Sequence, residues 1–248
     1  MSEKYKELYV KRIGITKDAF MITTELIDIF PANSTIELVK NNITISNKID
    51  NIILPKILSP EIPNFTIIDG LFDDNPIINS SLSDNNILGV NSIFYCKIHT
   101  IQIPVIKCTN ELLHFYECQI INHGDIFKIK NKTEMPFFKV TIGKDYKNDY
   151  LLKDGLGDGF YIETHDTPHI HQPANNDAEG FLVLAKRQGP MVMISKFRIP
   201  YGKAIYIPPN IYHNDSLLIG DYNVLYTRTD KYNTYVFKTY DNKIVNII

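Results

Sequence analysis

Short runs of apolar residues, separated by turn-forming residues, recur along most of the chain. They include residues 65–68, 92–98, 101–106, 115–121, 160–164, 180–187, 192–199, 204–207, 223–228 and 234–239. Pro, Gly, Asn and Asp punctuate these runs at intervals of about ten residues, a pattern typical of β-sandwiches and β-barrels. Within residues 222–229 the side chains alternate between two faces, as a strand requires. We therefore predict an all-β fold.

Two regions depart from this pattern. Residues 17–29 hold apolar residues at mixed spacing, without a clean N-cap, and are the best candidate for a helix. Residues 146–159 are polar and rich in Gly. They predict a boundary between a β-rich region, residues 1–145, and a β-barrel, residues 146–248. A long hairpin loop within one domain is the alternative.

Composition and charge narrow the class of protein. The 248 residues include 26 basic and 28 acidic ones, so the net charge is 26 − 28 = −2. A near-neutral chain carries no overall cationic field, which argues against nucleic acid or an anionic membrane as partner. No apolar run has the roughly 18 residues needed to span a bilayer. We expect a cytoplasmic protein, in which the three widely spaced cysteines stay reduced.

Candidate chemistry concentrates in the C-terminal part. Three of the seven histidines, His165, His169 and His171, lie within seven positions. In a strand, residues two apart project to the same face, so His169 and His171 are placed to hold one ion together. Glu179 follows and opens an apolar run, and His213 lies further on. Histidines exposed on a solvated loop are the alternative for this cluster.

The spacing of these residues resembles the cupin superfamily. Its first motif is His-x-His followed by a Glu that opens a strand. Its second is Gly, five residues, Pro, one residue, Gly, two residues, His. The second motif is matched here by Gly202, Pro208, Asn210 and His213. Asn210 replaces the second Gly, and Asn is the most acceptable other residue in a left-handed turn.

The match has two departures and covers about residues 160–229. The loop between His171 and Glu179 is about three residues longer than in the family, and Leu217 stands where the family usually has Asn. The resemblance implies a double-stranded β-helix, or jelly-roll barrel, over residues 146–248. Residues 124–129 echo the start of the second motif, so residues 1–145 are either a degenerate first cupin of a bicupin or an unrelated β extension.

The resemblance also implies a metal site in the barrel. Carried over by position, its ligands are His169, His171, Glu179 and His213. Three imidazoles and a carboxylate suit Fe, Mn, Zn, Ni or Co, and ligand type does not choose among them. A metal-free barrel whose histidines line a ligand pocket is the alternative.

Segments within the barrel region are similar to the ureidoglycolate lyase group. They are residues 165–173, 202–206 and 210–213. We therefore expect a metal-dependent enzyme acting on a small polar or carboxylated metabolite, with lyase or isomerase chemistry favoured over a dioxygenase. The candidate catalytic residues are His165 for proton transfer, Tyr212 at the barrel mouth and Arg198 for a substrate carboxylate. Arg187 and Arg228 are further candidates for the carboxylate, and each is otherwise a solvated strand residue.

Two other classes of function stay open. One is a sugar-binding or small-molecule-binding barrel without turnover. The other is a structural protein whose β-sandwich mediates oligomer contacts. The expected partners are a small-molecule substrate and, as an open alternative, a second copy of the chain in a homodimer.

Overall fold

The computed structural model describes residues 3–39, 42–46, 59, 61–76 and 88–248. Strands dominate these residues, which confirms the all-β prediction. The strands before residue 146 are β1 (Lys11–Ile13), β2 (Phe20–Phe30), β3 (Thr35–Val39), β4 (Asn42–Ile45), β5 (Thr66–Asp73), β6 (Ser92–Cys96), β7 (Thr100–Ile101), β8 (Val105–Ile106), β9 (Gln119–Ile121), β10 (Ile126–Lys128) and β11 (Met135–Ile142).

The strands after residue 146 are longer on average. They are β12 (Tyr161–His165), β13 (His169–Pro173), β14 (Glu179–Gln188), β15 (Met191–Phe197), β16 (Ala204–Ile207), β17 (Tyr212–Leu225), β18 (Tyr232–Thr239) and β19 (Asn246–Ile247). Strands β12, β14, β15, β16 and β18 lie close to their predicted positions, whereas the run predicted at residues 223–228 is only the end of β17, which begins at Tyr212 and stops at Leu225. The helical segments are η1 (Glu3–Leu8), α2 (Asn110–Leu113), η2 (His114–Tyr116) and η3 (Lys147–Leu151). Among the described residues, no helix combines the length and the apolar character that crossing a membrane would need.

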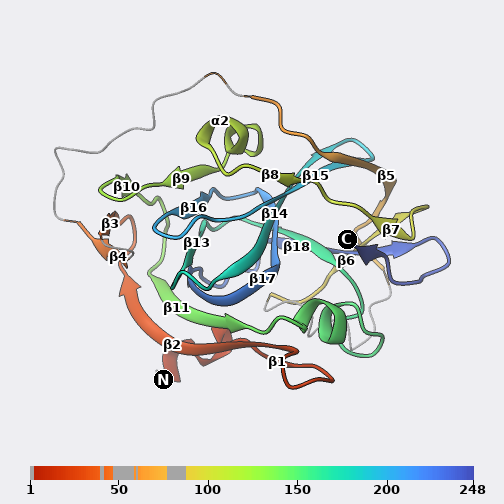
Figure 1. The fold of residues 1–248 in the computed structure, drawn as a ribbon, viewed down its shortest axis with the longest axis horizontal. Coiled ribbons are helices and arrows are strands. Elements are labelled where there is room, and N and C mark those ends of the chain that lie inside the picture. Colours follow the sequence, from red (N-terminus) through yellow and green to blue (C-terminus); the bar gives the residue numbers. More distant parts are fainter. Residues whose placement is uncertain (1–2, 40–41, 47–58, 60, 77–87) are drawn as a thin grey trace.

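A 14-stranded sheet contains most of the strands. Part of it closes on itself, since β17 pairs with β12, and the pairing continues through β18, β6, β5, β15 and β14 back to β17. The other part pairs β17 with β11 and β13. Figure 1 shows β13, β14, β16, β17 and β18 at the centre, with β2 and β11 on one side and β9 and α2 on the other. Strands from both sides of residue 146 thus pair within one sheet, and the division there stays a prediction.

The predicted helix over residues 17–29 is wrong, because the segment forms strand β2. Ile22, Thr23, Thr24 and Ile27 are β-branched and lose side-chain freedom in a helix. Strand β11 lies alongside β2 over most of its length and pairs with it. This pairing provides hydrogen-bond partners for the backbone of β2. The sequence pattern by itself did not reveal the pairing, because β11 lies far away along the chain.

A smaller correction concerns residues 115–121. The first part of this predicted strand belongs to η2, and only Gln119–Ile121 forms a strand. Glu117, at the end of η2, has a left-handed φ of 62° and turns the chain into β9. The short helix and the strand therefore share a run of apolar residues that periodicity alone did not divide.

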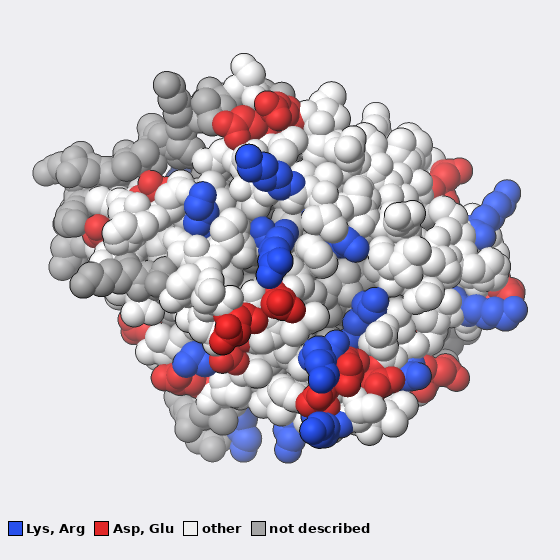
Figure 2. Space-filling model, in the orientation of Figure 1, with Lys and Arg blue, Asp and Glu red and all other residues white. Residues whose placement is uncertain are grey.

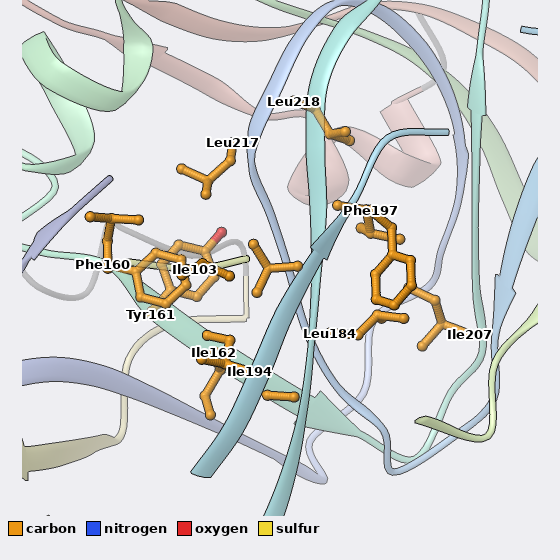
Figure 3. Packing of buried hydrophobic residues seen from close by; sticks show 14 of the residues in the cluster. Ile103, Phe160, Tyr161, Ile162, Leu184, Ile194, Phe197, Ile207, Leu217 and Leu218 are labelled. Carbon is orange, nitrogen blue, oxygen red and sulfur yellow. The ribbon is translucent and has the colours of Figure 1, made fainter. Parts of the chain in front are cut away.

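Apolar side chains from β12, β14, β15, β16 and β17 fill the main core. Figure 3 shows Leu184, Phe197 and Ile207 close together, with Ile194 and the β12 residues nearby. All of these side chains are almost completely excluded from solvent. On the face shown in Figure 2, basic and acidic side chains are interspersed, as the near-neutral charge leads one to expect.

Two isoleucines on neighbouring strands test this account of the core. Ile194 on β15 is fully buried, whereas Ile67 on β5 is 53% exposed. We expect Ile194→Ala to lower the free energy of unfolding by about 2–5 kcal/mol, because it removes buried methyl groups and leaves a cavity. Ile67→Ala should change it by less than about 0.5 kcal/mol. Urea unfolding measures both, and equal effects of the two substitutions would contradict the assignment of the core.

Candidate metal centre

Four buried side chains that can bind a metal converge where the two parts of the sheet meet. Glu163 and His165 lie two residues apart near the end of β12, so both project to one face. A three-residue turn then leads to His169, the first residue of β13. His213, the second residue of β17, lies directly opposite Glu163 in the antiparallel pairing of β12 and β17. We call these four residues the His–Glu group.

The spacing of their side-chain atoms fits one ion. One nitrogen or oxygen atom from each of the four side chains lies within 4.8 Å of the others. His213 Nε2 is 3.3 Å from His169 Nδ1 and 3.4 Å from Glu163 Oε1. Ligand atoms placed tetrahedrally about 2.1 Å from an ion would be about 3.4 Å apart. The distances from His213 to His169 and to Glu163 therefore match those of ligands around one ion, in a donor set of three nitrogens and one oxygen.

Hydrogen bonds orient two of the imidazoles. His213 Nδ1 lies 2.9 Å from the carbonyl oxygen of Ile211, so this nitrogen carries the proton and donates. His213 Nε2 is left with its lone pair toward the group. His165 Nδ1 lies 3.0 Å from Thr167 Oγ1, while His165 Nε2 is buried and has no hydrogen-bond partner among the described residues. Both rings thus have one nitrogen held by the protein and the other available to an ion.

The turns around the group are built by the second motif. Asn210 has a φ of 67°, which confirms the left-handed turn predicted at this position. Its backbone N–H donates to the carbonyl oxygen of His165 at 2.7 Å. The turn before β17 and the end of β12 are therefore tied together next to the ligand atoms.

Burial keeps the histidines neutral. It is the largest effect on the pKa of His165 and His171 and, with the charge of His213, lowers the pKa of each to about 3. Burial and neighbouring histidines also lower the pKa of His169, and burial lowers that of His213. Neutral imidazole is the form that binds metal ions. The site thus presents ligands in their binding form at neutral pH.

Only part of the ligand set predicted from the sequence is brought together here. His169 and His213 belong to the His–Glu group, and His165, predicted as a catalytic residue, joins them. His171 lies beside the group, with its ring 5.6 Å from that of His169 between centroids. Its two ring nitrogens are buried and have no hydrogen-bond partner among the described residues.

Glu163 takes the carboxylate position that the sequence analysis assigned to Glu179. On β14, Leu184 pairs with His213, and Glu179 lies five residues away, or about 16 Å along the strand. The side chain of Glu179 is 64% exposed and lies 3.9 Å from Arg198, which is 61% exposed. The predicted ligand Glu179 and the predicted catalytic residue Arg198 are therefore partners on the surface.

The other candidates also lie outside the group. Tyr212 directly precedes His213 in β17 and so projects to the opposite face. Arg187 packs over the ring of Phe72 at 3.6 Å, and Arg228 pairs with Glu7 at 3.0 Å. The sequence analysis missed Glu163, although its two-residue spacing from His165 in a predicted strand could have indicated it.

No protein-family model, curated protein or solved structure matches the chain.

The buried histidines predict a pH dependence of the metal-free protein. The pKa of His171 is about 3 in the folded chain against 6.5 in its ordinary state, so below about pH 6.5 only the unfolded chain takes up the proton. Stability is then complete above pH 6.5 and falls by up to about 1.4 kcal/mol per pH unit for each such histidine as the pH drops. Urea unfolding between pH 7.5 and 5 measures the slope.

A pair of variants tests the cause of this slope. His171→Leu removes one buried imidazole and should make the decline with falling pH shallower. His114→Leu makes the same change at an exposed position and should leave it as it is. An unchanged slope in His171→Leu would show that this imidazole is not held neutral by burial.

Proposed function

We propose that the chain is a metal-dependent enzyme of the cupin type, with its ion held by Glu163, His165, His169 and His213. The observation that carries the proposal is the convergence of three imidazoles and one carboxylate, all buried, within 4.8 Å. Buried polar side chains are normally paired, and a cation placed among neutral imidazoles and a carboxylate interacts favourably with the lone pairs of all of them. A divalent ion gains this interaction with the atoms already present.

The spacing along the chain supports the cupin assignment if the first motif is read from Glu163 to His169 and not from His169 to Glu179. Glu163 and His165 are two residues apart, and three residues separate His165 from His169. Seven residues separate His171 from Glu179, about three more than the family pattern has. The spacing from Glu163 to His169 therefore fits the first motif better. In this segment Glu stands at the first position and His at the last, which is the reverse of the family order. His213 keeps its place at the end of the second motif.

The donor set suits Fe, Mn, Zn, Ni or Co. When bound, such an ion supplies Lewis acidity toward a substrate oxygen or a coordinated water. The protein's own residues would prepare that chemistry. Ile211 holds His213 in the tautomer that exposes Nε2, Thr167 holds the far side of His165, and the apolar core around the barrel restricts access of bulk water.

A small polar or carboxylated metabolite is the proposed substrate. The preference for lyase or isomerase chemistry over dioxygenase chemistry follows from the segments similar to the ureidoglycolate lyase group. A barrel that binds a small molecule without turnover is the second candidate, because the unpartnered ring nitrogens of His171 would suit a bound polar ligand. The two differ in one observable: an enzyme consumes its ligand, whereas a binding barrel is stabilised by it and returns it unchanged.

Metal content tests the proposal directly. We expect the purified protein, equilibrated with Zn, Mn, Fe, Ni or Co and then dialysed, to hold about one equivalent of at least one of these metals. His169→Ala and His213→Ala should each reduce the retained metal to less than about a tenth of that value, since each removes a ligand atom. Elemental analysis by mass spectrometry gives the ratios. Retention of less than a tenth of an equivalent by the unaltered chain would refute the metal site.

A matched pair of Glu→Gln substitutions identifies the carboxylate ligand. Glu163→Gln keeps the shape of the side chain and removes its charge, so we expect affinity for zinc to fall by more than about tenfold. Glu179→Gln makes the identical change at the surface and should leave zinc affinity unchanged. Competition with a chromophoric chelator measures both. A larger loss of zinc affinity in Glu179→Gln than in Glu163→Gln would show that Glu179 is the ligand. Urea unfolding of each variant controls for loss of fold.

A further inference from the structure

A hollow of about 450 Å³ is lined in part by the turn between β12 and β13, whose residues lie between His165 and His169 of the His–Glu group. Its lining comes from four separate segments of the chain: the turn after β2, the loop between β10 and β11, the turn between β12 and β13, and the segment after β17. The lining residues are Asn33, Lys130, Asn131, Lys132, Thr133, Asp166, Thr167, Arg228 and Thr229. We call it the Thr167 hollow. Its size falls in the range of small-molecule sites, about 300–1,000 Å³.

The charge of the hollow is positive. Its lining includes three basic residues, Lys130, Lys132 and Arg228, and one acidic residue, Asp166. The Asp166 carboxylate already accepts a hydrogen bond from Thr229 Oγ1 at 2.6 Å, and Arg228 is paired with Glu7. Within the part of the chain that the structure describes, neither lysine forms an ion pair. Two ammonium groups are therefore available to a ligand at the same opening.

We infer that the Thr167 hollow binds a small anion that carries carboxylate or phosphate groups. Lysine ammonium groups attract both as compact point charges, and hydroxyl and amide groups of Thr and Asn in the lining complete the hydrogen bonding. The inference deepens the proposed function and rests on it for the role of the anion, which is the substrate or part of it. The binding step itself needs no metal ion.

Thr167 connects the Thr167 hollow to the His–Glu group. The residue lines the hollow, and its hydroxyl lies 3.0 Å from Nδ1 of His165. A ligand that draws on this hydroxyl changes the hydrogen bond that orients His165. Hydrogen-bond partners that orient a metal-binding histidine affect the properties of the metal. Binding of a ligand in the hollow should therefore change the properties of the bound ion.

Calorimetric titration of the metal-free protein tests the binding step. Inorganic phosphate and malonate serve as the two probes, and glycerol is the uncharged control. We expect one molecule of at least one anion to bind per chain and glycerol not to bind. The anion that binds more tightly decides between phosphate and carboxylate chemistry. If neither anion binds with a Kd below about 10 mM, near the weak limit of a specific small-ligand site, the inference is overturned.

Two double variants locate the site. Lys130→Met with Lys132→Met removes both ammonium groups of the hollow and should weaken anion binding by about tenfold or more. Lys97→Met with Lys107→Met removes the same charge from two exposed positions outside the hollow and should leave binding unchanged. Equal binding by the two double variants would show that the anion binds elsewhere, and urea unfolding confirms that both remain folded.

A separate experiment tests whether an anion in the hollow affects the ion of the His–Glu group through Thr167. In cobalt-loaded protein we expect the tighter-binding anion to shift the visible absorption bands of the ion. Thr167→Val removes the hydroxyl and keeps the shape, so the anion should bind more weakly, through the remaining lysines, and the shift should be absent even when the site is saturated. A shift that persists in this variant would overturn the link. Failure of cobalt to bind would count against the proposed function, and titration of the metal-free protein would still decide whether the anion site exists.

Discussion

The pairing of β17 with its neighbours is the constraint on which the rest of the structure depends. This 14-residue strand belongs to both parts of the sheet: its first residues pair with β12 and β14, and its last with β11 and β13. Close approach of β14 requires Gly180, whose φ is +80° and where an added Cβ would lie 2.2 Å from the carbonyl oxygen of Leu217. The junction that β17 creates is where the ligand side chains meet.

Burial at this junction has an electrostatic consequence. The apolar core lowers the pKa of the histidines and so holds four imidazoles neutral in a small volume, with one carboxylate among them. Neutral rings and a carboxylate present lone pairs to one another, an arrangement that a cation stabilises. The same core that stabilises the fold thereby prepares the site for an ion.

The candidate site was partly predictable from the sequence. His169 and His213 were found from short-range spacing and from the second motif, and the left-handed turn at Asn210 followed from the tolerance of Asn for positive φ. Glu163 was missed because the carboxylate was sought after the histidines, at Glu179, and not before them. Both glutamates lie in or next to a strand and a few residues from closely spaced histidines, so spacing alone did not rank them.

The sequence by itself determined most strands of the C-terminal part, the all-β class and the turn before His213, because alternation, β-branched residues and turn residues act over a few neighbouring positions. Only the tertiary structure decided that residues 20–30 form a strand, that Glu179 stays at the surface with Arg198, and that Glu163 faces His213. These outcomes depend on which strands pair and in which register. Such pairing joins residues far apart in the chain, which local patterns do not encode.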